Sequence, residues 1–313
     1  MVEYYKTIDG RVTEIGGFTE GCWINMVHPS SDELEAISRA AHVEEEFVRA
    51  ALDPEESSRL DTEDDQLLMI VDIPMVEKSS VEDGGQMFST LPMGIVVAHN
   101  AVITVCLEDS IILRSIAEGA VKGVHTALRT RFVFQILLRV AGRFLKNLRM
   151  IERDFTRIEK RLYDSLQNEE LIQLLGLSKS LVYFSASLKG NEVTMEKVLR
   201  GRVLKLYEDD RDILEDALIE IRQAIEMAGI YSSILSGTMD AYASVVSNNL
   251  NIIMKVLTVL TIIMTIPNII FGFYGMNIGG EAIPGDFFWW IPLLISAAAC
   301  FFAWFMLKKK NLY

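Results

Sequence analysis

One run of 19 residues without a charge, residues 256–274, constrains this chain more than any other feature of its sequence. A helix rises about 1.5 Å per residue, so such a run covers the hydrocarbon core of a bilayer, which is about 30 Å thick. We therefore expect a transmembrane helix over residues 251–274. Polar residues are rare and informative in such a helix, because hydrocarbon offers them no hydrogen-bonding partner.

The polar residues of this segment share one side of the expected helix. At about 100° per residue, an arc of roughly 80° contains all four of them, Thr258, Thr261, Thr265 and Asn268. The same side extends toward the N-terminus through Met254, Asn251, Ser247, Ser244 and Asp240. Two interpretations stay open. The stripe is either a hydrogen-bonded contact between helices or the wall of a pore that several copies of the helix line together.

A second uncharged segment follows at residues 287–307, and its first four residues are aromatic. Lys255 and the basic tail 308–313, with Lys308, Lys309 and Lys310, place cationic residues beside both segments on one side. The connecting loop 275–286 contains neither Lys nor Arg. By the positive-inside rule, we expect a multi-pass cell-membrane protein with two spans, both termini cytoplasmic and the loop outside.

Charge and composition exclude several classes of function. Before residue 251 the chain has 26 basic and 41 acidic residues, a formal charge of −15, which is unsuited to nucleic acid and attracts cations. Three isolated cysteines, Cys22, Cys106 and Cys300, suggest neither a disulfide framework nor a cysteine metal site. Because no phosphate-binding glycine loop and no cluster of nucleophile, base and oriented acid occurs, we expect neither an enzyme nor an organic cofactor.

The remaining pattern predicts an α+β membrane protein. Residues 1–108 form a cytoplasmic α/β domain, with two or three short strands in 2–27, helices at 31–41 and 43–52, and strands at 67–73, 88–98 and 101–107. Residues 109–192 form a helical hairpin region, with helices at 126–166 and 169–189, the second ending at Gly190-Asn191. A stalk helix over 193–250 then continues unbroken into the first span.

Pro267 lies inside the first span. It removes the amide that would bond to the carbonyl of Ile263. Within a membrane, such a carbonyl is tolerated where a neighbouring helix or water satisfies it.

The first span ends in Tyr274-Gly275-Met276-Asn277, and its lower end reads Met254-Lys255-Val256-Leu257-Thr258. With a second span and a lysine-rich end, this combination resembles the CorA family of magnesium/cobalt transporters, two-span divalent-cation channels with a Gly-Met-Asn signature. The resemblance is specific from about residue 240 to 310 and more general upstream. It implies a homopentamer in the cell inner membrane, with the first span lining the pore and the second packed outside it.

The resemblance also implies roles for individual residues. Gly275, Met276 and Asn277 correspond to the selectivity filter, with Asn277 as its outer ring. Met254 and Leu257 match an apolar constriction near the cytoplasmic mouth. The pore-lining set would be Asn251, Met254, Leu257, Thr258, Thr261, Thr265 and Asn268. Their neutral oxygens suit Mg²⁺, which gives up its water shell reluctantly and prefers hard oxygen ligands.

Mg²⁺ is expected as both the transported and the regulatory ion. The membrane potential would drive influx, and cytoplasmic Mg²⁺ bound between subunits would close the pore. The family's stalk acid corresponds to Asp216 and a second acidic ring to Asp240, while Asp61, Asp64 and Asp65 are candidate partners on the soluble domain. Two alternatives remain. One is a CorA-like Zn²⁺ transporter, although Met276 favours Mg²⁺ with Co²⁺ or Ni²⁺ as secondary ions. The other is a membrane-anchored coiled-coil scaffold or sensor without transport.

Overall fold

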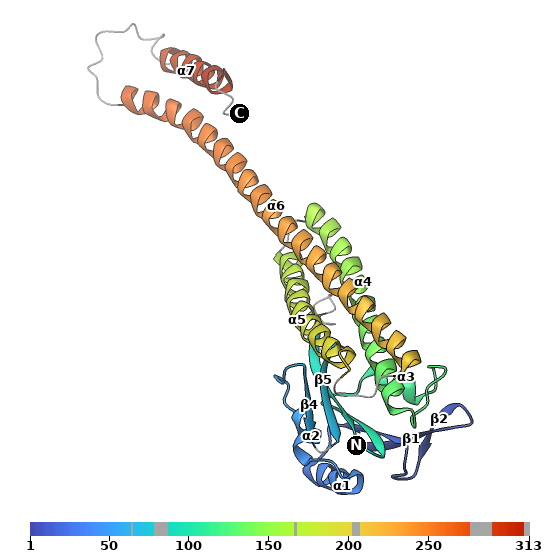
Figure 1. The fold of residues 1–313 in the computed structure, drawn as a ribbon. Helices are drawn as coiled ribbons and strands as arrows, with labels where there is room; N and C mark the ends of the chain where they lie inside the picture. Colours follow the sequence, from blue (N-terminus) through green and yellow to red (C-terminus); the bar gives the residue numbers. More distant parts are fainter. Residues whose placement is uncertain (64, 78–86, 166–167, 202–206, 276–289, 310–313) are drawn as a thin grey trace. The chain divides into compact units, whose positions relative to one another are not determined.

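The computed structural model describes residues 1–63, 65–77, 87–165, 168–201, 207–275 and 290–309. The chain divides into two compact units, Met1–Ser236 and Gly237–Tyr313. The first unit contains a β-sheet flanked by helices, and the second contains the C-terminal part of a long helix together with the last helix (Figure 1). The expected α+β fold class, with an α/β N-terminal domain and long helices, is confirmed.

A seven-stranded sheet forms the centre of the first unit, in the order β2-β1-β3-β7-β6-β5-β4. Neighbouring strands are antiparallel, except that β3 and β7 are parallel. The β6–β7 hairpin is confirmed, whereas β4 lies in an acidic stretch for which no strand was predicted. The strand bounds are β1 Val2–Ile8, β2 Arg11–Ile15, β3 Cys22–Val27, β4 Arg59–Glu63, β5 Gln66–Val76, β6 Phe88–Val97 and β7 Ala101–Cys106.

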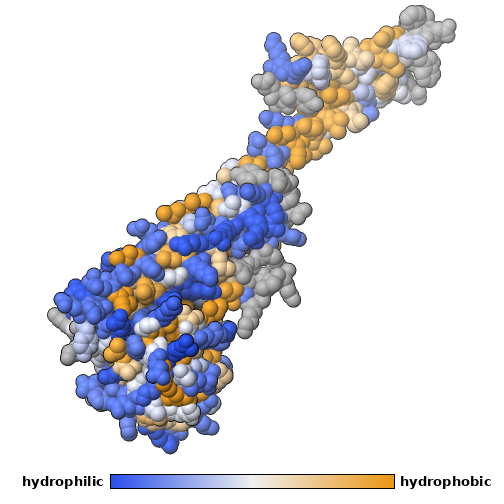
Figure 2. Space-filling model, turned by 90° about the vertical axis from the view of Figure 1, so that its right-hand side faces the viewer, coloured by the Kyte–Doolittle hydropathy of each residue, from blue (hydrophilic) through white to orange (hydrophobic). Residues whose placement is uncertain are grey.

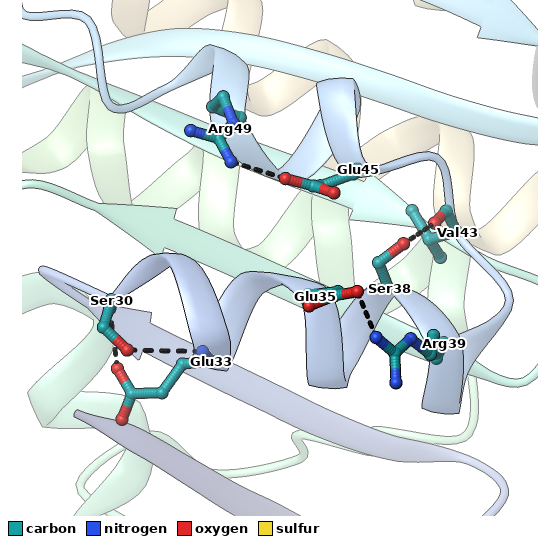
Figure 3. A network of polar contacts seen from close by, with 8 residues as sticks. All are labelled: Ser30, Glu33, Glu35, Ser38, Arg39, Val43, Glu45 and Arg49. Carbon is teal, nitrogen blue, oxygen red and sulfur yellow. Dashed lines mark hydrogen bonds and ion pairs between the residues drawn. The ribbon is translucent and has the colours of Figure 1, made fainter.

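Helices α1 (Ser31–Ala41) and α2 (Glu45–Ala50) cover one face of the sheet. Ser30 and Glu33 form a capping box that satisfies free amides at the start of α1 (Figure 3). Leu34, Ile37 and Val48 pack with alternate residues of the central strands in one buried cluster. Successive residues of a strand point to opposite faces of the sheet. Because helices cover both faces, apolar residues are needed on both.

The other face carries α3 (Ile111–Ala117), α4 (Arg129–Ser165) and α5 (Asn168–Leu199). Trp23 of β3 stacks on Tyr5 and meets Phe132 of α4 edge-on at 5.4 Å between ring centroids. Its indole N–H donates to the hydroxyl of Thr104 at 2.8 Å. The aromatic cluster therefore fixes α4 against the middle of the sheet.

Helix α5 is also held by its buried residue Asn191. The Asn191 amide oxygen accepts from the Asp72 N–H and from the Ser58 hydroxyl, at 2.8 and 2.9 Å, and its NH₂ donates to the Asp72 carbonyl at 2.8 Å. Asp72 lies on β5 just beyond the residues that β4 pairs. The side chain of Asn191 thus replaces a strand at that edge, where β5 would otherwise present an unpaired N–H and C=O.

The predicted helix end at Gly190-Asn191 is wrong, as is the unbroken helix from residue 193. Helix α5 runs through both residues to Leu199, and α6 (Glu208–Tyr274) starts after a break. Gly190 is glycine because a Cβ there would lie 3.1 Å from the Ser58 hydroxyl. The helix ends instead at Leu199, and Gly201 just beyond it has φ +73 and donates its N–H to the Val198 carbonyl.

Two polar contacts tie the N-terminal part of α6 to its neighbours within the first unit. Arg222 donates to Glu192 and Glu196 of α5 at 2.8 and 2.6 Å. The Tyr231 hydroxyl donates to Glu152 of α4 at 3.0 Å. With buried Leu214, Ala217, Ile221 and Ala224 on the same helix, these contacts make α4, α5 and this part of α6 one packed group.

The second unit consists of the rest of α6 and of α7 (Trp290–Lys309). Hydrophobic residues dominate the face of this unit that Figure 2 shows. Both helices are long and apolar enough to cross a membrane, and so is α5. However, 44% of the apolar window of α5 is buried inside the structure, against 6% for α6 and 11% for α7. The apolar character of α5 is thus partly used in packing on the sheet.

Candidate functional site

The polar stripe lies on the part of α6 that belongs to the second unit. Its residues between Asn251 and Asn268 are all exposed in the single chain, as are the neighbouring apolar residues Met254 and Leu257. Polar side chains are rare on such an apolar helix, so their exposure along one side marks that side as the candidate functional surface.

The last helix, α7, contacts the side of α6 opposite the stripe. The least exposed residue of the apolar part of α6 is Val259, at 8%, and the side chains of Ile263, Ile266, Pro267 and Ile270 are half-buried. These positions recur every three or four residues and lie roughly 180° around the helix from the stripe. On α7, Pro292 and Ser296 are buried. Within one chain, therefore, α7 leaves the stripe uncovered.

The three threonines of the stripe share one hydrogen-bonding arrangement. Each hydroxyl donates to the backbone carbonyl four residues earlier: Thr258 to Met254 at 2.7 Å, Thr261 to Leu257 at 2.8 Å and Thr265 to Thr261 at 2.7 Å. The hydroxyl hydrogen is thereby engaged within the helix. What each side chain presents outward is oxygen lone pairs, which attract a cation or the hydrogens of its water shell.

Of the signature residues, Gly275 is described, and Met276 and Asn277 lie outside the described residues. The Gly275 N–H donates to the Phe271 carbonyl at 2.8 Å, at the end of α6. A Cβ at Gly275 would lie 3.2 Å from the same oxygen. Close approach of backbone to backbone accounts for a glycine at this position, and φ there is not positive.

Among the described residues of the first unit, the candidate regulatory acids do not gather into a metal site. Asp216 and Asp240 are exposed on α6, Asp61 is ion-paired with Arg59, and Asp65 is exposed with φ +61. Asp64 lies outside the described residues. Among the residues that the structure describes, no group of three or more His, Cys, Asp or Glu could hold a metal ion.

The surroundings of Asp216 are nevertheless acidic. Glu220, one turn further along α6, has a carboxylate oxygen that is buried against Gly142 of α4 without a hydrogen-bond partner in the described structure. Burial raises the pKa of Glu220, the charge of Asp216 raises it further, and Arg139 and Arg149 of α4 oppose the rise. A cation beside Asp216 would therefore stabilise two neighbouring carboxylates.

One contact in the second unit was not predicted. The Cys300 thiol of α7 lies 3.5 Å from the carbonyl oxygen of Ile263, within hydrogen-bonding distance for sulfur. This is the carbonyl that Pro267 leaves without its usual amide. The sequence contained a clue, because few side chains of the second span can donate a hydrogen bond.

Comparison with known proteins identifies similar chains. The family model of CorA-like Mg²⁺ transporter proteins matches residues 19–309. The cobalt/magnesium transport protein CorA of Methanocaldococcus jannaschii is 27% identical over 264 residues, which make up 82% of this chain and 79% of that protein. The protein of the same name from Thermotoga maritima is 34% identical over 113 residues, 32% of this chain and 31% of that one.

Solved structures show the same fold. The complete structure of the CorA magnesium transporter from Methanocaldococcus jannaschii covers 100% of this chain and 99% of its own, with a TM-score of 0.85 and 21% identity. The full-length CmaX protein matches with a TM-score of 0.74 at 16% identity, and the match covers 99% of this chain and 97% of CmaX. The cytoplasmic domain of ZntB from Vibrio parahaemolyticus matches with a TM-score of 0.62 at 16% identity, and the match covers 79% of this chain and 98% of that domain.

Proposed function

This chain belongs to the family of CorA-like Mg²⁺ transporter proteins, and we propose that it is a divalent-cation channel that admits Mg²⁺, with Co²⁺ and Ni²⁺ as secondary ions. The observation that carries the proposal is the polar stripe of α6. It is exposed on the side that α7 leaves free, and its three threonines present oxygen lone pairs outward. Such neutral oxygens hold hydrated Mg²⁺ without trapping it.

Two spans cannot enclose a pore, so several copies of α6 must contribute their stripes. We propose a homopentamer, the assembly that the family resemblance implies, with α6 inside and α7 outside. Both termini would be cytoplasmic, so the sheet-containing unit would lie on that side. The domain divisions given by the sequence are part of the same proposal, with the stalk now starting at Glu208.

In this assembly Asn277, with Gly275 and Met276, would form the outer selectivity ring, and Met254 with Leu257 an apolar constriction. A ring of apolar side chains can close a pore by excluding water. The driving force would be the membrane potential, because a divalent ion that enters a negative interior gains about 4.6 kcal/mol per 100 mV.

Closure would depend on cytoplasmic Mg²⁺ bound between subunits. Asp216 and Asp240 on α6, facing Asp61, Asp64 or Asp65 of a neighbour, are the proposed ligands. The acidic pair Asp216 and Glu220 supports this, since burial and mutual repulsion already raise the pKa of Glu220. Bound cations would reduce repulsion between subunits, and loss of those cations when internal Mg²⁺ falls would release the stalks.

The test is Mg²⁺ uptake into proteoliposomes under an inside-negative potential. We expect uptake by the native chain, and loss of uptake or of ion selection with Asn277→Ala. Thr261→Val, which replaces one of the stripe's three hydroxyls by a methyl group, should reduce uptake several-fold, whereas Ile262→Val at the neighbouring exposed position should not. If folded oligomer conducts no divalent ion, or if Asn277→Ala conducts normally, the scaffold interpretation replaces the channel. Preferential Zn²⁺ uptake would reassign the ion.

A further inference from the structure

The hydrogen-bond ladder of α6 has a gap in the middle of its apolar part. Pro267 has no N–H, so the Ile263 carbonyl cannot receive the helical hydrogen bond from residue 267. An unsatisfied carbonyl is costly in hydrocarbon, where no water replaces the missing donor. A side chain of a neighbouring helix is one group that can supply the missing donor.

Helix α7 places Cys300 at the gap, with its sulfur 3.5 Å from the Ile263 oxygen. The contact lies between the faces on which the two helices meet, beside buried Val259 of α6 and buried Ser296 of α7. Residues on this side of α7 are mostly small, among them Ser296, Ala299 and Ala303. A thiol is a weak donor, and in the described structure its sulfur lies within hydrogen-bonding distance of this carbonyl.

We propose that Cys300 is a positioning residue for the pore-lining helix, which it orients through the carbonyl that Pro267 frees. The proposal rests on the proposed function in one respect, namely that α6 lines the pore. The gap lies level with Thr265 and Asn268, the upper members of the stripe. A helix with a missing bond can rotate there, so the thiol bond fixes the direction in which these two side chains point.

A double-mutant cycle tests the coupling between the two positions. Cys300→Ala should reduce Mg²⁺ uptake about two- to five-fold, the factor expected for loss of one weak hydrogen bond. Cys300→Ser, whose hydroxyl is a better donor, should restore uptake. In a Pro267→Ala chain, where residue 267 again donates to Ile263, Cys300→Ala should have no further effect. Equal losses from Cys300→Ala in both backgrounds would overturn the proposal, because they would indicate packing alone.

A spectroscopic measurement tests the contact between Cys300 and Ile263 independently of ion transport. The S–H stretching band of Cys300, identified by difference against Cys300→Ser, should lie at lower frequency than that of a free thiol. Pro267→Ala should return it to higher frequency, because the helical amide then competes for the carbonyl. Cys106→Ala serves as the control for the other thiols. A Cys300 band that is unchanged by Pro267→Ala contradicts the proposal even if the protein conducts ions. A shifted band in a chain without ion flux would support the contact and refute only the channel.

Discussion

Asn191 has the largest effect that we expect from a single buried polar residue of the first unit. It is fully buried in the middle of α5, and its amide bonds to the N–H and the C=O of Asp72 on β5. Because these backbone groups lie beyond the end of β4, no strand can replace the side chain. The residue joins a helix to a sheet edge by the same pair of bonds that two strands would exchange.

Replacing Asn191 by alanine should therefore destabilise the protein by about 2–3 kcal/mol, since it leaves buried backbone groups without partners. Urea unfolding of the full-length protein in detergent, followed by tryptophan fluorescence, measures the effect. Gln223→Ala, which removes an exposed amide from α6, is the matched control and should change the free energy of unfolding by less than about 0.5 kcal/mol. Similar shifts for both variants would mean that the Asn191 bonds add nothing.

The buried carboxyl of Asp72 should make the stability of the protein depend on pH. Burial raises the pKa of its carboxyl above the ordinary value of 3.8, and the nearby hydroxyls of Ser187 and Ser58 partly oppose the rise. The folded state therefore binds the proton more tightly than the unfolded state, so stability falls as pH rises from 3.8 through the folded pKa. We expect Asp72→Asn to flatten this part of the curve and to be at least as stable as the native chain at neutral pH.

The measurement for Asp72 is the free energy of unfolding at a series of pH values, with the exposed acid variant Glu226→Gln as control. The control should follow the native curve. An Asp72→Asn curve that is parallel to the native one would show that this carboxyl does not titrate differently on folding.

At the scale of elements, the helices show what sequence patterns can and cannot reveal. The last helix, α7, and the end of α6 at Tyr274 follow from apolar length, and the β6–β7 hairpin from β-branched runs around a two-residue turn. The break between α5 and α6 was misplaced because glycine and asparagine at 190–191 were interpreted by local propensity. Their actual roles, contact with Ser58 and bonding to β5, depend on residues more than 100 positions away.

The candidate site divides in the same way. The side of α6 that carries the stripe could be read from spacing alone, because a helix converts spacing into direction. The position of α7 opposite the stripe could not, since it depends on how two apolar helices pack. Nor could the thiol at Ile263 be predicted with certainty, although the missing amide at Pro267 indicated that some donor was required.

Helix α5 provides a prediction about span number. It is as long as a span, yet it packs on β5 and β6. The native Val182 is 60% exposed. We expect a cysteine at this position, Val182→Cys, to react with a membrane-impermeant thiol reagent from the cytoplasmic side. Leu294→Cys of α7 should not react, because lipid would surround this residue in the proposed arrangement. Both variants are made in a chain whose three native cysteines, Cys22, Cys106 and Cys300, are replaced. Each variant then has a single thiol, which should react after denaturation. Protection of Val182→Cys in intact vesicles would indicate a third span.

At the scale of the whole molecule, charge is the dominant quantity. The sequence before residue 251 carries a formal charge of −15, and an oligomer would multiply this charge in a confined volume. Repulsion of this kind favours separation of subunits unless cations bind. Regulation by divalent ions is thus a property that the assembly would have even if each single acid contributed little.

Asp216→Ala should weaken the protection that Mg²⁺ gives α6 against proteolysis in the full-length protein. We expect the Mg²⁺ concentration for half-maximal protection to rise about five-fold or more, the lower end of usual coupling between a ligand and a conformational state. Glu226→Ala, which removes another exposed acid of α6, is the control and should leave it unchanged. Equal protection of Asp216→Ala and native protein would exclude Asp216 as a ligand.

The threonine hydroxyls of α6 have a consequence for anions. A hydroxyl that is free to rotate serves a chloride ion as donor as readily as it serves a cation as acceptor. At Thr258, Thr261 and Thr265 the hydrogen is committed to the helix's own carbonyls, so a chloride ion at these levels would meet lone pairs only. Discrimination between the signs of charge would then require no acidic residue in the membrane. It would follow from threonines placed where a carbonyl of their own helix accepts the hydroxyl's hydrogen bond.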